Sequence, residues 1–295
     1  MKPSSVLITG AAGGSGMALA EKMAKDPTHF QIDTLLDVDR PVEKEKLLAL
    51  GKRTNAVRAI AGDVLFNRDN VAYEVVRHSE ADVIALIAAV NVDRKNIPLE
   101  RRQPLAEAQD VALHDRILSY LNEQSAEGRR RMLIVFNSVL GVLPDFTDPN
   151  FLQLLERLGE EDKYGAMKRR QLEMLRRYMP QLVAAGVDPC IVCPGALDTG
   201  FAEDALASMG RGNTVMKKIS EEFLGRNPVK RKGETPHPKW HQEALINPQD
   251  IAQVLTQITI HWRQTGKIPE RFREWVILNK EDLLSDAQFL APPSP

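Results

Sequence analysis

Strand-length apolar runs alternate with helical patterns along this 295-residue chain. A short β-strand, a helix and a second strand form a right-handed βαβ unit, and successive units build a parallel sheet. The strand candidates are residues 6–9, 34–37, 57–62, 83–88, 132–137, 188–193 and 275–278, and the helix candidates are residues 17–25, 105–121, 165–182 and 248–262. The alternation therefore predicts an α/β fold, a doubly wound parallel sheet with helices on both faces.

The helix candidate at 248–262 carries the clearest pattern. Its apolar residues Ile251, Val254, Leu255 and Ile258 recur at helical spacing, and Asn247-Pro248 supplies a cap followed by proline in the first turn. The chain has neither an internal repeat nor a clear linker, so we expect one domain over residues 1–290. Within it, residues 200–245 are expected to form a substrate-binding loop or lid, and their least regular part is the charged Pro- and Gly-rich segment 225–244. Residues 291–295 are expected to form a flexible tail.

The charge balance narrows the possible partners. The formal net charge is −1, so the chain lacks the basic excess typical of nucleic-acid and membrane-surface binding. No apolar run approaches the length of a membrane span. Cys190 and Cys193 lie in a strand-like run, which favours buried strand cysteines over a zinc or redox site. We expect a soluble cytoplasmic protein with no metal site and a small-molecule substrate.

Residues 9–16, TGAAGGSG, connect the first strand to the first helix. In a doubly wound sheet, ligands bind beyond the carboxyl ends of the strands, and the N-terminus of the following helix attracts phosphate. Gly10, Gly14 and Gly16 would then serve a tight turn, close approach to a pyrophosphate, and close helix–sheet packing. A glycine-rich turn without a ligand fits the bare motif equally well, but the flanking strand and helix and a downstream acid favour a dinucleotide.

That acid lies in TLLDVDR, where Asp37 or Asp39 would hold the hydroxyl groups of the adenosine ribose. If Asp39 ended the strand, Asp37 would be a carboxylate one pleat deeper, where burial is costly. Asp37 is therefore favoured. A carboxylate there would repel a 2′-phosphate, and Gly13 stands where a basic residue would serve NADP, so NAD is favoured over NADP. Arg40, a basic residue close to this position, instead favours NADP, because it could bind the 2′-phosphate.

Six segments in order resemble motifs of the short-chain dehydrogenase/reductase family, whose fold is Rossmann-like. Residues 9–16 resemble its TGxxxGxG motif, and they are followed by AGDV (61–64), DVIALIAAV (82–90), IVFNSVLG (134–141), YGAMK (164–168) and CPGALDT (193–199). The segment 82–90 lies where the family has Asn-Asn-Ala-Gly and departs from it, because only the small pair Ala88-Ala89 remains to face the cofactor. By this resemblance Ser138, Tyr164 and Lys168 are catalytic. It also implies these dinucleotide contacts: Thr9, Gly10, Gly13, Gly14, Ser15, Gly16, Asp37, Asp39, Asp63, Val64, Ala88, Ala89, Tyr164, Lys168, Pro194, Gly195 and Thr199.

Tyr164 and Lys168 are four residues apart in a helical stretch, so they share one face. A phenol ordinarily has a pKa near ~10, and a neighbouring ammonium together with an oxidised nicotinamide ring would favour its phenolate. Tyr164 could then take a hydroxyl proton while hydride passes to NAD, or run the reverse on a carbonyl. Ser138 would stabilise the charge that develops on the substrate oxygen.

The leading hypothesis is thus an NAD(H)-dependent oxidoreductase that interconverts an alcohol and a carbonyl compound. The 26 positions from Ser138 to Tyr164 are closer to the family's extended branch and favour an alternative, an NAD-dependent epimerase or dehydratase of a nucleotide-linked sugar. A hypothesis of another class is a non-catalytic protein that senses a dinucleotide. By family analogy the helix of Tyr164 packs against its counterpart in a homodimer or homotetramer.

Two further segments depart from the family or bear on the substrate. Single-domain members carry a helical Asn where this chain reads VALHDRIL, so His114 and Asp115 are the nearest polar residues, and both are expected on an exposed helical face. His237, Trp240 and His241 lie in the expected lid and could line a substrate pocket, although surface or packing roles are more common for such residues.

Overall fold

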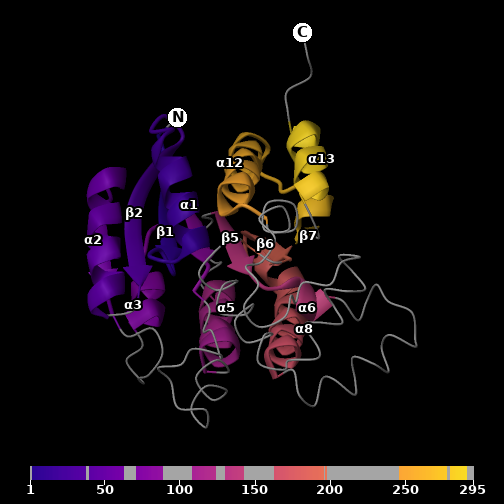
Figure 1. Ribbon diagram of the computed structural model, residues 1–295. Helices are drawn as coiled ribbons and strands as arrows, with labels where there is room; N and C mark the ends of the chain where they lie inside the picture. The colour runs from indigo at the N-terminus through magenta and orange to yellow at the C-terminus, as the bar shows by residue number, and fades with distance from the viewer. Residues whose placement is uncertain are drawn as a thin grey trace, which may run out of the picture.

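A computed structural model describes residues 2–37, 40–62, 71–88, 108–123, 130–142, 163–195, 197, 246–277 and 280–290. Within these residues, seven strands form one sheet in the order β3-β2-β1-β4-β5-β6-β7, and each neighbouring pair is parallel. The strands are β1 (Ser4–Thr9), β2 (Phe30–Asp37), β3 (Arg58–Ala61), β4 (Val83–Leu86), β5 (Arg131–Phe136), β6 (Val187–Pro194) and β7 (Glu274–Ile277). The predicted doubly wound parallel sheet is confirmed (Figure 1).

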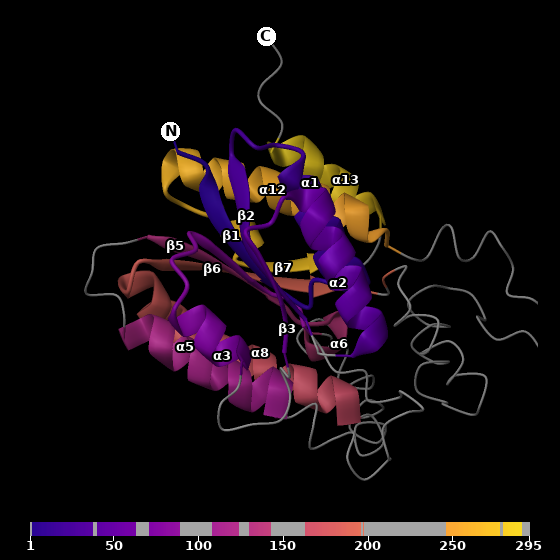
Figure 2. The ribbon, with the colours of Figure 1, turned by 90° about the vertical axis from the view of Figure 1, so that its left-hand side faces the viewer.

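Helices cover both faces of this sheet, as Figure 2 shows with the sheet seen between them. One face carries α1 (Gly14–Ala24), α2 (Pro41–Thr54), α12 (Pro248–Thr265) and α13 (Lys280–Leu290). The other carries α3 (Val71–Arg77), the π-helical turn η1 (Ala108–Leu113), α5 (His114–Glu123), α6 (Val139–Val142) and α8 (Lys163–Ala184). A short 3₁₀ turn, η4 (Glu270–Phe272), leads into β7.

The central strands explain why their sequences read as unbroken apolar runs. In β1, Val6 and Ile8 belong to the core under α1 and α12, while Leu7 between them belongs to the core under α5 and α8. Side chains of a strand alternate between the two faces of its sheet, and here both faces are buried. Cys190 and Cys193 of β6 lie one in each core, fully buried, as the sequence predicted.

Strand order reverses next to β1, which pairs with β2 through Val6 and Ile32 and with β4 through Val6 and Val83. The chain passes from β1 to β2 and β3 on one side and resumes at β4 on the other. Doubly wound sheets bind ligands at such a switch point, beyond the carboxyl ends of the strands. The glycine-rich segment after β1 lies at this point.

Local sequence signals marked some elements better than others. The side chain of Asn247 accepts a hydrogen bond from Gln249 N at 2.9 Å, so it caps α12 as predicted, and Gly266 ends that helix at φ +72°. The pattern missed α2, which buries only a narrow stripe around Leu47 and Leu50. It also began β2 four residues late, because Gln31 and Asp33 interrupt the apolar run of its first half. No helix in the described part of the chain is long and apolar enough to cross a membrane.

Candidate active site

The glycine segment forms a tight connection between β1 and α1. Gly10 has a φ of +70°, and a Cβ atom added to it would lie 2.6 Å from the backbone nitrogen of Ala88. A Cβ atom on Gly16 would lie 2.2 Å from the carbonyl oxygen of Gly10. Both distances are far below any van der Waals contact, so glycine is required at these two positions for steric reasons.

Gly13 and Gly14 differ from these two glycines because they are exposed. Gly13 is the N-cap of α1 in an extended conformation, and Gly14 is the first residue of the helix. The loop therefore presents bare backbone at a helix N-terminus, where N–H groups and the helix dipole favour an anion. The contact of Gly13 and Gly14 with a pyrophosphate stays a prediction, and their exposed position at the start of α1 is compatible with it.

Asp37 is the last residue of β2 and is only 8% exposed. Its carboxylate Oδ2 accepts a hydrogen bond of 2.6 Å from the backbone N–H of Ala12 in the glycine loop. The carboxylate favoured from the sequence as a ribose ligand thus also supports the loop, a contact that sequence reasoning missed. Asp39, the other candidate, lies outside the described residues.

Thr9 ties the ends of two neighbouring strands together. Its Oγ1 accepts hydrogen bonds from the backbone N–H groups of Ile87, at 3.2 Å, and Ala88, at 3.4 Å. The hydroxyl is buried and directed at the end of β4. Ala88, which the sequence predicted to contact the dinucleotide, is held directly beside Gly10 by this arrangement.

The second half of the candidate site follows β5. Asn137 comes directly after the strand, and its Oδ1 accepts a hydrogen bond of 2.8 Å from the backbone N–H of Ser138. Its Nδ2 donates to the backbone carbonyl of Lys168 at 2.9 Å. A Cβ atom on Gly141 of α6 would lie 2.6 Å from Asn137 Oδ1, so a bare residue there lets α6 pack against α8. Asn137 therefore joins Ser138 to the helix of Lys168.

Lys168 is 1% exposed, and its Nζ donates to the side-chain Oε1 of Gln171 at 3.2 Å. Gln171 is fully buried, and its Nε2 lies 2.6 Å from Nδ1 of His114. The prediction that His114 lies on an exposed face is wrong, because this residue is 3% exposed and packs toward α8. Asp115 is exposed as predicted and accepts a hydrogen bond from Tyr178 at 3.1 Å.

A sequence signal for the burial of His114 existed. It occupies the first position of an i, i+3, i+4, i+7 stripe with Ile117, Leu118 and Leu121, all buried against α8 and the sheet. A polar residue in an apolar stripe requires a buried hydrogen-bond partner. That partner is Gln171, which is 57 residues further along the chain, and no local sequence signal identifies it.

The remaining predicted site residues fall into two groups. Pro194 ends β6 and is buried, and Gly195 N donates to the backbone carbonyl of Ile277 at 2.8 Å. The backbone of Tyr164 is in α8, one turn before Lys168, and its side chain lies outside the description. Also outside the described residues are Asp63, Val64, Ala89, Thr199, His237, Trp240 and His241.

The topology brings the described parts of the candidate site to one edge of the sheet, where the strands have their carboxyl ends. Parallel neighbours β1, β4, β5 and β6 end beside one another, so the segments that follow them adjoin in the same order. These segments hold Gly10 to Gly14, Ala88, Ser138 and Gly195. Asn137 N donates to Val192 O at 2.8 Å, which fixes the segment after β5 beside β6.

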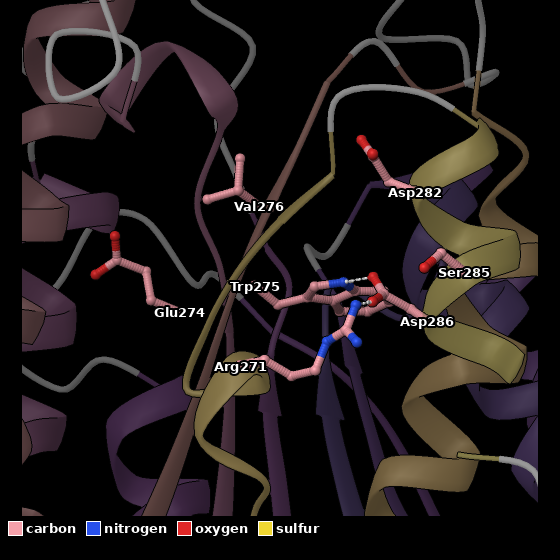
Figure 3. A pocket seen from close by; sticks show the side chains of 7 residues that line it. All are labelled: Arg271, Glu274, Trp275, Val276, Asp282, Ser285 and Asp286. Carbon is pink, nitrogen blue, oxygen red and sulfur yellow. Dashed lines mark hydrogen bonds and ion pairs between the residues drawn. The ribbon is translucent and has the colours of Figure 1, made fainter. Parts of the chain in front are cut away.

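A separate hollow of about 330 Å³ lies between β7 and α13 (Figure 3). Asp286 is buried there and accepts hydrogen bonds from Trp275 Nε1, at 2.5 Å, and from Arg271. Figure 3 shows the indole and the guanidinium converging on this carboxylate. These bonds from Arg271 and Trp275 to Asp286 hold α13 against β7, so we assign this hollow a structural role.

No family model and no curated protein matches the sequence. Solved structures match nearly the whole chain. A 3-ketoacyl-(acyl-carrier-protein) reductase from Brucella melitensis complexed with NADH has a TM-score of 0.57 and 17% identity, over 94% of this chain and 96% of its own. The L-sorbose reductase from Gluconobacter frateurii complexed with NADPH and L-sorbose also has a TM-score of 0.57 and 17% identity, over 87% and 89%.

A third structure is described as an oxidoreductase of the short-chain dehydrogenase/reductase family from Burkholderia thailandensis. Its TM-score is 0.57, its identity 16%, and the match covers 99% of both chains. At these identities the likeness concerns the fold. The chain therefore has the fold of the short-chain dehydrogenase/reductase enzymes, as the resemblance of its motifs predicted.

Proposed function

We propose that the protein is an NAD-dependent oxidoreductase that transfers hydride between the nicotinamide ring and an alcohol or carbonyl substrate. One observation carries the proposal. The glycine loop after β1 and the segment after β5 that joins Ser138 to the helix of Lys168 lie at the same edge of the sheet. The first presents a helix N-terminus suited to an anion, and the second carries the residues to which the motif resemblance assigns the proton transfer. Many activities share this fold, so the site supports the proposal and the fold alone does not.

The residues fit a dinucleotide. In this proposal the pyrophosphate lies against Gly13 and Gly14, the adenosine ribose near Asp37, and the nicotinamide ribose near Lys168. The bound dinucleotide supplies the hydride acceptor or donor, which no amino-acid side chain provides. NAD is favoured over NADP because Asp37 is a carboxylate at the end of β2, where a 2′-phosphate would be repelled.

Tyr164 is the proposed general acid and base. Its hydroxyl would take the proton of an alcohol during oxidation and return it to the substrate oxygen during reduction. The Lys168 ammonium, one helical turn along α8, stabilises the phenolate form by its charge. The Ser138 hydroxyl would hydrogen-bond the substrate oxygen on which negative charge develops.

The test removes the phenolic hydroxyl alone. Tyr164→Phe is expected to lower turnover of a ketone or aldehyde substrate by about 10²- to 10⁴-fold, the range of acid–base catalysis, while NADH affinity changes little. Tyr178→Phe is the matched control, since Tyr178 is on the same helix and its hydroxyl bonds Asp115 away from the site. Fluorescence titration measures NADH and NADPH binding, and absorbance at the nicotinamide band measures turnover across a panel of carbonyl compounds.

Unchanged turnover in Tyr164→Phe would refute the mechanism. Tight NADH binding without net consumption on any alcohol or carbonyl compound would instead favour a tightly held cofactor, as in an epimerase, or a sensor. Failure to bind either dinucleotide would refute the proposal as a whole.

A further inference from the structure

Four buried polar side chains from three parts of the chain form one hydrogen-bonded network beside the candidate site. His114 begins α5, Asn137 follows β5, and Lys168 and Gln171 are on α8. None of the four is more than 6% exposed. Polar groups taken out of water are costly unless they are paired, so a network of this size constrains the conformation of every member.

The donors and acceptors determine how the Gln171 amide is oriented. Lys168 Nζ and Asn137 Nδ2 are both donors, and both lie within hydrogen-bond distance of Gln171 Oε1, at 3.2 and 2.8 Å. The oxygen of the amide must therefore face them, and the Nε2 group must donate toward His114 Nδ1 at 2.6 Å. With the amide in this orientation, Nδ1 of His114 is the acceptor, which corresponds to the tautomer that carries the ring proton on Nε2.

The same amide is linked to both halves of the proposed catalytic set. It binds the Lys168 ammonium directly, and it binds Asn137, whose Oδ1 in turn accepts from the backbone N–H of Ser138. A shift of the Gln171 side chain would break its hydrogen bonds to the Lys168 ammonium and to the Asn137 side chain together. Neither residue could be held by Gln171 if its amide were reversed, because the amide N–H group would then face two donors.

We infer that Gln171, braced by His114, is a positioning residue that fixes the Lys168 ammonium and, through Asn137, the backbone at Ser138. The inference rests on the proposed function, since it assigns to Gln171 the task of presenting Lys168 to the nicotinamide ribose. It adds two residues, Gln171 and His114, that the motifs of the sequence do not include.

A double-mutant cycle on NADH affinity tests this inference without any substrate. Gln171→Met keeps the length of the side chain and removes both hydrogen-bonding groups, and Lys168→Met removes the ammonium. If Gln171 acts through Lys168, Gln171→Met weakens NADH binding about tenfold in the wild-type background and less than about twofold in the Lys168→Met background. A purely structural role would weaken binding by the same factor in both backgrounds.

The matched control is Gln181→Met, the same substitution at an exposed position of α8, which is expected to bind NADH like the wild type. Circular dichroism and urea unfolding verify that each variant is folded. If Gln171→Met does not fold, Gln171→Asn replaces it in the cycle, because the shorter amide cannot reach its three partners at once.

Two results would overturn the inference while leaving the proposed function intact: equal effects of the Gln171 substitution in both backgrounds, or wild-type NADH affinity in Gln171→Met. Both are distinct from failure of the proposed function, which would appear as a wild-type protein that binds no NADH or as full turnover in Tyr164→Phe. Wild-type protein that binds no NADH would overturn the inference as well.

Discussion

The carboxylate of Asp37 accepts a hydrogen bond of 2.6 Å from the backbone N–H of Ala12, 25 residues earlier in the chain. Both residues are buried, and the bond joins the end of β2 to the glycine loop after β1. A charged acceptor makes a stronger hydrogen bond than a neutral one. The residue proposed to select the cofactor therefore also holds the loop that would bind its phosphates.

Asp37→Ala is expected to destabilise the protein by about 1–3 kcal/mol, because the amide of Ala12 loses its buried acceptor. Asp37→Asn keeps an acceptor oxygen, so the loss should be smaller. Both substitutions remove the charge and should raise NADPH affinity relative to NADH. Urea unfolding and fluorescence titration measure the two effects.

Asp33→Ala is the control for Asp37. Asp33 is on the same strand, and its carboxylate accepts hydrogen bonds from the surface residue Arg58 at 2.7 Å and from the Thr34 hydroxyl at 2.7 Å. The free energy of unfolding should fall by about 1 kcal/mol, because one partly exposed ion pair and one hydroxyl hydrogen bond are lost. The ratio of NADPH to NADH affinity should stay at the wild-type value. A ratio that does not move in Asp37→Ala would contradict the assignment of Asp37 as ribose ligand.

Gly16→Ala and Gly13→Ala should differ sharply although they lie three residues apart. The new Cβ would be 2.2 Å from Gly10 O in the first case and 3.2 Å in the second. We expect Gly16→Ala to cost at least about 3 kcal/mol of stability, because backbone cannot yield as a side chain does, and Gly13→Ala less than about 1 kcal/mol. Equal thermal midpoints for the two variants would show that the loop does not pack as described.

Substitution of Asp188 is expected to lower the free energy of unfolding without changing NADH affinity. It is 5% exposed near the amino end of β6, where it accepts from Trp262 Nε1 at 2.8 Å and Arg130 at 2.9 Å. Asp188→Ala leaves the indole N–H without its acceptor and is expected to cost about 2–4 kcal/mol in urea unfolding. Asp188→Asn keeps an acceptor for Trp262 and should lose less. NADH affinity should be unchanged in both, and a selective loss of affinity would be unexpected.

The two cysteines should be inert in the folded protein. Burial raises the pKa of Cys190 to about 12, and burial followed by the charge of Glu274 raises the pKa of Cys193. At pH 8 only about one Cys190 in 10⁴ is then a thiolate, the form that reacts. A thiol-specific aromatic disulfide reagent should label neither cysteine under native conditions and both in guanidinium chloride. Rapid native labelling would contradict their burial.

The same raised pKa values predict alkaline destabilisation. A cysteine in the unfolded chain has a pKa near about 8.5, so above this pH the folded state binds more protons than the unfolded state. The buried, protonated thiol of Cys190 therefore contributes fully to the free energy of unfolding below about pH 8.5, and this contribution is lost as the pH rises toward 12. Urea unfolding at pH 8 and pH 10 should therefore show a smaller loss for Cys190→Ala than for the wild type.

The sequence determined the sheet because the relevant signal is local. The apolar runs around Ile8 and Ile134 are continuous and do not alternate with polar residues, which is typical of strands buried on both faces of a parallel sheet covered by helices. The glycine-rich segment after Thr9 likewise predicted the turn at Gly10 and a following helix, although the helix was expected at residues 17–25 and begins three residues earlier, at Gly14. The helix α2 and the first half of β2 were harder to predict from the sequence, because they bury fewer apolar side chains and carry polar residues between them.

Only the tertiary structure decided the partners of the buried polar groups. Gln171 is an ordinary helical residue in the sequence, and His114 was expected on a solvent-exposed face. Their contact spans 57 residues, and it forms because α5 and α8 pack side by side on one face of the sheet. The bond from Ala12 to Asp37 has the same origin in adjacent strand ends. Periodicity shows which face of an element is buried, but the match of one donor to one acceptor depends on how distant elements pack.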